Sequence, residues 1–208
     1  MGPLGFARPL LVALALLLAG APAPAAERVI VVLGDSLTAG HGVTAEEAYP
    51  ALLEHHLRRA GFAYRVVNAG VSGDTSAGGL RRLDWVLRSQ PEIVIVALGA
   101  NDGLRGVPIA ALRDNLMAIV TRLQAAGARV LLVGMRVPPN YGATYANAFA
   151  EAYGEVARRT SAAFLPFLLD GVGGEASLNQ ADGIHPNAAG QRAVADRIWP
   201  LLQPLLRR

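Results

Sequence analysis

The chain contains no cysteine and no lysine, and these two absences exclude several kinds of chemistry. Without cysteine there is no disulfide framework, no thiol nucleophile and no thiolate ligand for a metal. All 19 basic residues are arginine, so Schiff-base, pyridoxal-phosphate and phosphate-loop lysine mechanisms are excluded as well. Any catalysis must therefore come from other side chains.

The charge of the chain is also low, with a formal net value of +3. The arginines are spread along the sequence and do not form a run. Because nucleic-acid binding surfaces usually cluster their basic residues, we do not expect a nucleic acid as partner.

The first 26 residues have the pattern of a secretory signal peptide. Arg8 gives a positive flank, residues 10–18 are apolar, and Ala23 and Ala25 supply small residues in A-x-A spacing. The apolar run is short for a bilayer span, although an uncleaved membrane anchor or a buried helix is the alternative interpretation. We therefore predict cleavage near Ala26, export to the periplasm or out of the cell, and no stable membrane insertion afterwards.

After this leader, short runs rich in Val and Ile alternate with longer helical stretches. The expected strands are residues 28–33, 64–67, 92–98, 128–135 and 162–167. The expected helices are residues 45–60, 75–89, 108–126, 144–160 and 188–206. This alternation predicts an α/β fold with a parallel sheet covered on both faces. No repeat or composition break divides residues 27–208, which we expect to form a single domain.

Ser36 is the candidate nucleophile. It belongs to the segment Gly34-Asp35-Ser36-Leu37, which directly follows the first expected strand. We therefore expect a tight turn at the carboxyl end of a strand, which is the edge where open α/β sheets bind ligands. The alternative is that a serine after glycine only forms the turn or caps a helix.

Asp182 and His185 are the candidate partners of that serine. They stand three residues apart on a turn that Pro186 makes rigid, just before the last expected helix. A serine hydroxyl needs a base to remove its proton, and the base needs a partner that fixes its tautomer. The alternative is that Asp182 caps the helix that begins near Pro186 and His185 is an ordinary loop residue.

The other three histidines are weaker candidates for the base. His55 and His56 lie in the middle of an expected helix beside two arginines, which indicates a solvated face. His41 follows the Ser36 turn and could reach the rim of the cleft, but no carboxylate near it in sequence is an obvious orienter. His185 is therefore the strongest candidate.

Gly73 and Asn101 are candidates for stabilising an oxyanion. Gly73 follows the second expected strand, and because it has no Cβ its backbone N–H can come close to a ligand. Asn101 follows the third expected strand, which places its amide at the same edge of the sheet. Both segments are also ordinary turn sequences before a helix, so neither is specific alone. The conjunction of four such segments at one sheet edge is far more specific.

These four segments resemble the blocks of the SGNH, or GDSL, hydrolase superfamily. The strings are GDSLTAG from Gly34, the Gly73 segment, GAND from Gly99 and DGIHPN from Asp182. The longer strings SGDTS, GANDGLRG and PPNYG are similar to the thioesterase I, lysophospholipase L1 and arylesterase branch. The resemblance implies a flavodoxin-like three-layer α/β/α fold with five parallel strands.

The resemblance also implies roles for the candidate residues. Ser36 would form an acyl-enzyme, with His185 as its base and Asp182 as the orienter of that base. The oxyanion would be held by the backbone N–H groups of Ser36 and Gly73 and by the Asn101 side chain. Two further acidic residues, which follow Gly34 and Asn101 directly, match family positions, but their charges have structural explanations as turn or cap residues.

We therefore expect an exported serine esterase that acts on ester and thioester bonds of small or single-chain acyl substrates, without a cofactor or a metal. A shallow groove bordered by residues 103–108 and 138–145 is expected to receive the substrate. A carbohydrate O-deacetylase with the same triad is one alternative. A noncatalytic flavodoxin-like binding module is the other, because a fold does not dictate a function.

Overall fold

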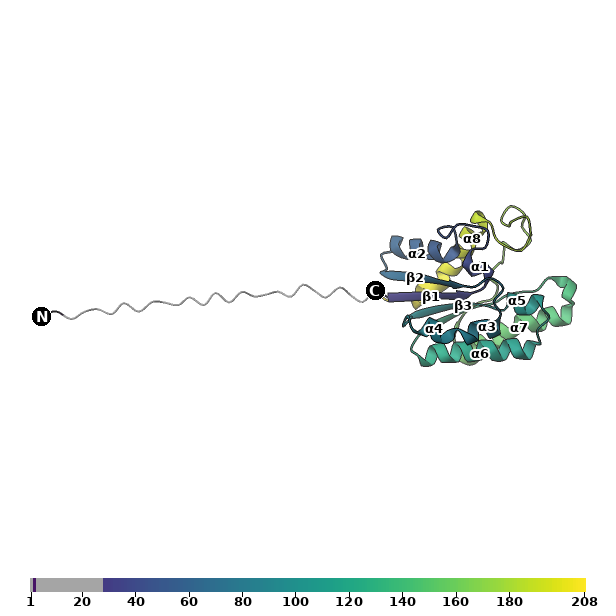
Figure 1. Ribbon diagram of the computed structural model, residues 1–208, viewed down its shortest axis with the longest axis horizontal. Helices are drawn as coiled ribbons and strands as arrows, with labels where there is room; N and C mark the ends of the chain where they lie inside the picture. The colour runs from purple at the N-terminus through teal and green to yellow at the C-terminus, as the bar shows by residue number, and fades with distance from the viewer. Residues whose placement is uncertain (1, 3–27) are drawn as a thin grey trace.

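The computed structural model describes residue 2 and residues 28–208 of the chain. Residues 28–208 form a five-stranded parallel sheet with the strand order β2-β1-β3-β4-β5 and helices on both faces (Figure 1). This confirms the predicted fold class. The predicted signal peptide lies, apart from Gly2, outside the described residues, so it stays a prediction.

The strands end at a common edge. They are β1 (Arg28–Gly34), β2 (Tyr64–Gly70), β3 (Ile93–Ala97), β4 (Arg129–Val133) and β5 (Ala163–Leu165). Gly34 pairs with Gly70 on one side and with Ala97 on the other, so the carboxyl ends of β1, β2 and β3 are level. The segments that follow these three strands are therefore neighbours in space.

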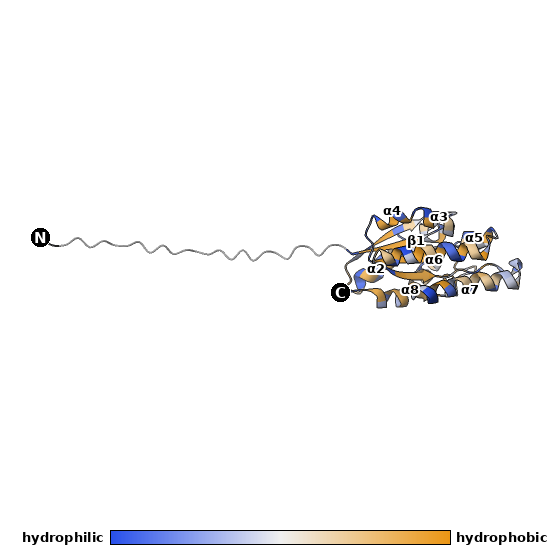
Figure 2. Cartoon of the chain, turned by 90° about the horizontal axis from the view of Figure 1, so that it is seen from below, coloured by the Kyte–Doolittle hydropathy of each residue, from blue (hydrophilic) through white to orange (hydrophobic). Residues whose placement is uncertain are grey.

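Helices cover both faces of the sheet and account for its apolar composition. On one face lie α2 (Tyr49–Arg59) and α8 (Ala188–Leu202) (Figure 1). On the other face lie α3 (Ser76–Arg81), α4 (Leu83–Leu87), α6 (Ile109–Ala125) and α7 (Ala143–Thr160). Because neither face meets water, β1 and β3 are continuous apolar runs, and Figure 2 shows the polar residues on the outer helices.

Two short helices at the carboxyl edge correct the sequence-based expectation. α1 (Ser36–Ala39) stands where a tight turn was expected after β1, and α5 (Ala100–Leu104) stands where a turn was expected after β3. Both are too short to show a helical period in the sequence. The helix expected over residues 75–89 is divided into α3 and α4 at Arg82, and the 3₁₀ turns η1 (Pro139–Tyr141) and η2 (Gln203–Leu205) were also not predicted.

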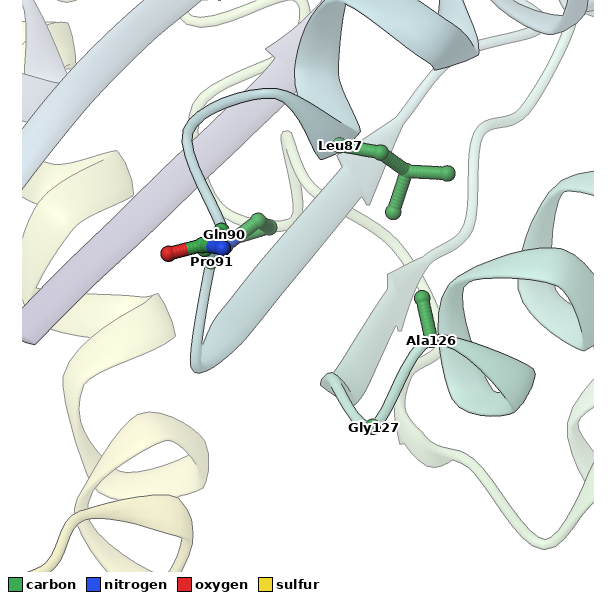
Figure 3. Close-up of a pocket in the computed structure, with 5 residues that line it drawn as sticks. All are labelled: Leu87, Gln90, Pro91, Ala126 and Gly127. Atoms are coloured by element: carbon green, nitrogen blue, oxygen red, sulfur yellow. The ribbon is translucent and has the colours of Figure 1, made fainter.

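At the opposite edge of the sheet, a small depression lies between the ends of α4 and α6 (Figure 3). It is lined by Leu87, Gln90, Pro91, Ala126 and Gly127, none of which titrates. Within residues 28–208, no helix has both the length and the hydropathy needed to cross a bilayer.

Candidate active site

Ser36 is the first residue of α1, at the carboxyl end of β1. The helix begins there because Asp35 caps it, with the Asp35 Oδ1 accepting the Leu37 N–H at 3.0 Å. The helix ends at Gly40 in the left-handed conformation. The half-buried Ser36 side chain therefore sits at a fixed position on the edge of the sheet.

The structure brings Ser36, His185 and Asp182 together in one chain of hydrogen bonds. His185 Nε2 lies 2.9 Å from Ser36 Oγ, and His185 Nδ1 lies 2.7 Å from Asp182 Oδ2. With the imidazole proton on Nδ1, His185 donates to Asp182 and its Nε2 accepts from the serine hydroxyl. This is the arrangement that a serine nucleophile requires of its base.

Asp182 is held by local contacts and does not cap a helix. Its Oδ1 accepts the backbone N–H groups of Ile184 at 2.9 Å and of His185 at 3.0 Å. The backbone and side-chain hydrogen bonds from His185, followed by the one from Ile184, hold the Asp182 pKa below its usual range. The cap of α8 is Asn187, whose Oδ1 accepts the Ala189 N–H at 2.9 Å, so the alternative reading of Asp182 as the cap is wrong.

Gly73 lies in the turn between β2 and α3, close to the start of α5. Its φ of +79° is a conformation that L side chains rarely adopt, and its carbonyl oxygen accepts from Arg105 Nη2 at 3.0 Å. Over residues 28–208, neither the Gly73 N–H nor the Ser36 N–H has an acceptor within the protein. Both donors are therefore available to a bound group.

The Asn101 amide points into the same region from α5. Its Nδ2 donates to the Asp74 carbonyl oxygen at 3.0 Å and to Asp35 Oδ2 at 3.3 Å. Both of its N–H groups are thus engaged within the protein, and the bond to Asp35 is the longer one. A third donor therefore becomes available to a ligand only when Asn101 gives up one of these bonds.

Asp35 and Asp102 are both buried and both make structural hydrogen bonds. Burial disfavours the charged form and raises the Asp35 pKa to about 6, although the Leu37 N–H and the charge of His185 act in the opposite direction. Asp102 accepts the Ser76 N–H at 2.8 Å and the Ser76 hydroxyl at 2.5 Å, which ties α5 to the start of α3. The structural roles expected for these residues are thus present, with Asp35 as a helix cap.

Two supporting residues had no signal in the sequence. Arg82 donates through Nη2 to the Gly34 carbonyl oxygen at 2.9 Å and through Nε to Asp74 Oδ2 at 2.7 Å. The buried Gln191 side chain accepts the Tyr49 N–H at 2.9 Å and links α8 to α2. The Arg82 bond to Gly34 spans 48 positions and the Gln191 bond to Tyr49 spans 142, so no local pattern marks them.

The remaining histidines lie in different environments. The His41 ring packs against the His185 ring, with 4.6 Å between the ring centroids. His55 is exposed, but His56 stacks on Trp199 and its Nε2 lies 3.0 Å from Asp196 Oδ1. The solvated face expected for both is therefore found at His55, whereas His56 packs against α8 and is 28% exposed.

The two segments expected to border a groove contact one another directly. The Tyr141 hydroxyl donates to the Leu104 carbonyl oxygen at 2.9 Å, and the Tyr145 hydroxyl donates to the Val107 carbonyl oxygen at 3.0 Å. These bonds hold η1 and the start of α7 against the end of α5 and the segment that follows it. Over residues 28–208, no group of three or more His, Asp or Glu side chains is arranged to hold a metal ion.

Comparisons with known proteins show which family this chain resembles. The sequence model of the GDSL-like lipase/acylhydrolase family matches residues 32–193. The chain is 48% identical over 183 residues to esterase TesA of Pseudomonas aeruginosa, covering 88% of this chain and 91% of that protein. It is 42% identical over 183 residues to thioesterase 1/protease 1/lysophospholipase L1 of Escherichia coli K12, covering 88% and 86% of the two chains.

A solved structure shows the same architecture. A crystal structure of TesA superposes with a TM-score of 0.84 at 47% identity, covering 86% of this chain and all of the other. The fold, the matched segment and the relatives agree, and they confirm the resemblance found in the sequence blocks. The chain belongs to the GDSL-like lipase/acylhydrolase family and is a serine ester hydrolase of the SGNH type.

Proposed function

We propose that this protein is exported and hydrolyses ester and thioester bonds of small or single-chain acyl substrates through an acyl-enzyme on Ser36. One observation carries the proposal: Ser36 Oγ, His185 Nε2, His185 Nδ1 and Asp182 Oδ2 form a continuous chain, with distances of 2.9 Å and 2.7 Å. A neutral His185 in this position is placed to remove the proton of the serine hydroxyl.

In the first half of the proposed reaction, Ser36 Oγ attacks the carbonyl carbon while His185 Nε2 takes its proton. The imidazolium then gives this proton to the departing alkoxide or thiolate, which leaves an acyl group on Ser36. In the second half, His185 takes a proton from water, the resulting hydroxide attacks the acyl carbon, and Ser36 recovers its proton as the acid leaves. The ionised Asp182 stabilises the imidazolium in both halves.

The oxyanion of each tetrahedral intermediate is proposed to bind between α1, the Gly73 turn and α5. Support comes from the unengaged N–H groups of Ser36 and Gly73 and from the Asn101 amide beside them. Asn101 would exchange its 3.3 Å bond to Asp35 for one to the oxyanion. Hydrogen bonds at active sites are often long before substrate binds, and they tighten in the transition state.

Exposed apolar residues close in sequence to the site residues favour an acyl chain over a sugar. Val71 is 48% exposed and precedes Gly73 by two residues, Leu104 is 42% exposed and follows Asn101 by three, and Ile184 is 51% exposed and directly precedes His185. Burial of such side chains against an aliphatic chain is favourable by roughly 25 cal/mol per Å² of apolar surface. The names of the relatives, which include an esterase and a thioesterase, agree with this substrate class.

Two measurements test the proposal. A fluorophosphonate probe should label Ser36, and a set of acyl esters with aryl, choline-phosphate and coenzyme A leaving groups should be hydrolysed faster than acetylated sugars. Preferred hydrolysis of acetylated sugars would support the O-deacetylase alternative, and a folded protein that the probe does not label would support the noncatalytic one. N-terminal sequencing of the exported protein should find a start near Ala26 or Glu27, and an intact leader in a membrane fraction would show that it is an uncleaved membrane anchor instead.

A further inference from the structure

The loop that carries His185 is tied to the loop after Ser36 by the side chain of Gln180. The Gln180 Nε2 donates to the His41 carbonyl oxygen at 2.6 Å and to the Pro186 carbonyl oxygen at 3.1 Å. Its backbone N–H also donates to the His185 carbonyl oxygen at 2.8 Å. Gln180 therefore joins two segments that lie 139 positions apart in the sequence.

These bonds form a second connection between Ser36 and His185, in addition to the one between their side chains. The His41 N–H donates to the Ser36 carbonyl oxygen at 3.1 Å, and the His41 carbonyl oxygen accepts from Gln180. Gln180 then reaches Pro186, which directly follows His185. The most direct of these connections thus runs through the Gln180 amide and short stretches of backbone, beside a second one in which Gln191 Nε2 of α8 donates to the Leu37 carbonyl oxygen at 3.3 Å.

The contact surface around Gln180 is closely fitted. A Cβ on Gly42 would lie 2.0 Å from Gln180 Oε1, so a side chain at this position would displace the amide. Gly42 also has a φ of +76°, which favours glycine. The adjacent His41 ring lies against the imidazole of His185 at a centroid separation of 4.6 Å. We call Gln180, Gly42 and His41 the loop joint.

Two side-chain amides in the same segment as Gln180 act differently. Asn187 Nδ2 donates to the Ser177 carbonyl oxygen at 2.9 Å, and Asn179 Nδ2 donates to the Glu175 carbonyl oxygen at 2.8 Å. Both bonds stay within the segment between β5 and α8, so they shape that segment without fixing its distance from Ser36. Gln180 instead crosses to the segment after α1.

We propose that Gln180 is a positioning residue, which holds the imidazole of His185 at hydrogen-bond distance from Ser36 through the loop joint. The inference rests on the proposed function, because it assigns Gln180 a task in the same reaction. A base that is displaced by about 1 Å costs roughly a hundredfold in rate, because proton transfer requires hydrogen-bond contact in the transition state. In this positioning role, Gln180 contacts neither the substrate nor the reacting atoms.

The first test replaces Gln180 by methionine, which has a similar length and forms no such hydrogen bonds. Gln180→Met should lower kcat on an aryl ester by about 10- to 100-fold while KM changes by less than about threefold, because geometry is lost and the binding surface is kept. The matched control is Gln124→Met, since Gln124 Nε2 donates to the Thr160 carbonyl oxygen at 2.9 Å between α6 and the end of α7. The control should keep its kcat.

The second test is a double-mutant cycle across the loop joint. Gly42→Ala should lower kcat in the wild-type protein and lower it by a smaller factor in a Gln180→Ala background. The reason is that the three atoms nearest to the added Cβ all belong to Gln180, whereas the cost of the positive φ is the same in both backgrounds. This cycle also tests the positioning role of Gln180 if the Gln180→Met variant does not fold.

The outcomes separate this inference from the proposed function. A Gln180→Met kcat within twofold of wild type, or an equal Gly42→Ala factor in both backgrounds, overturns the role of Gln180. Loss of kcat in Gln180→Met and Gln124→Met alike also overturns it, because a general loss of structure then explains the effect. A wild-type protein whose Ser36 does not react with a fluorophosphonate contradicts the proposed function instead.

Discussion

The buried carboxyl group of Asp35 should give this protein an unusual dependence of stability on pH. Asp35 is fully buried, and its pKa is raised from 3.8 to about 6 by burial. In the folded protein it therefore keeps a proton at pH values where the unfolded chain has released it. The stability that this provides is complete below pH 3.8 and is lost as the pH rises through the folded pKa near 6.

The magnitude follows from the size of the shift. Each pKa unit corresponds to 1.36 kcal/mol, so the change from 3.8 to about 6 amounts to about 3 kcal/mol. Asp35→Asn removes the titration but keeps an acceptor for the Leu37 N–H. The free energy of unfolding of Asp35→Asn minus that of wild type should therefore increase by about 3 kcal/mol between roughly pH 3.5 and pH 7.

Urea titrations of both proteins at a series of pH values measure this difference. The cost of placing an amide beside Asn101 does not depend on pH. It therefore shifts the difference in unfolding free energy by a constant and leaves its change with pH unaffected. The opposite pH dependence of Asp182 is present in both proteins and cancels. A difference that is flat with pH, or that decreases as pH rises, would refute the argument that burial controls the ionisation of Asp35.

Three further predictions concern the proposed reaction. Ser36→Ala, His185→Ala and the double mutant should share a similar low activity in steady-state assays, because residues that act as a unit are not additive; multiplicative losses would speak against the triad. Asn101→Ala should lower kcat by about two to three orders of magnitude with a smaller change in KM. Asn101→Asp should lower kcat further, because a carboxylate repels the oxyanion. A near wild-type kcat in the aspartate variant excludes Asn101 from the mechanism. Asp182→Asn should lower kcat by about 10⁴-fold. The variant should also be less stable than wild type at neutral pH, and this difference in stability should shrink as the pH falls below 3.8, because a lowered pKa stabilises the folded state only while the carboxylate is ionised. Urea titrations in which the difference does not shrink contradict the assignment.

The sequence alone determined the architecture and the position of the site. Alternating apolar runs and helical stretches predicted the parallel sheet, because strands buried on both faces must be continuously apolar. The order of the chain then placed the Ser36 and Asn101 segments at the same sheet edge, since parallel strands end together. The contact of Asp182 with His185 was also predictable, because it spans three residues within one turn.

Only the tertiary structure decided the environment of these residues. The extent of burial of Asp35 depends on every element that covers it, so its raised pKa has no sequence signal. The bond between Gln180 and His41 joins residues 139 positions apart, and the bond between Tyr141 and Leu104 brings together the two segments that were expected to border a groove. Helices as short as α1 and α5 carry too few residues for periodicity to show, and packing at the sheet edge fixes them instead. Local pattern thus predicted the candidate reacting groups, whereas long-range packing and desolvation set their geometry and charge.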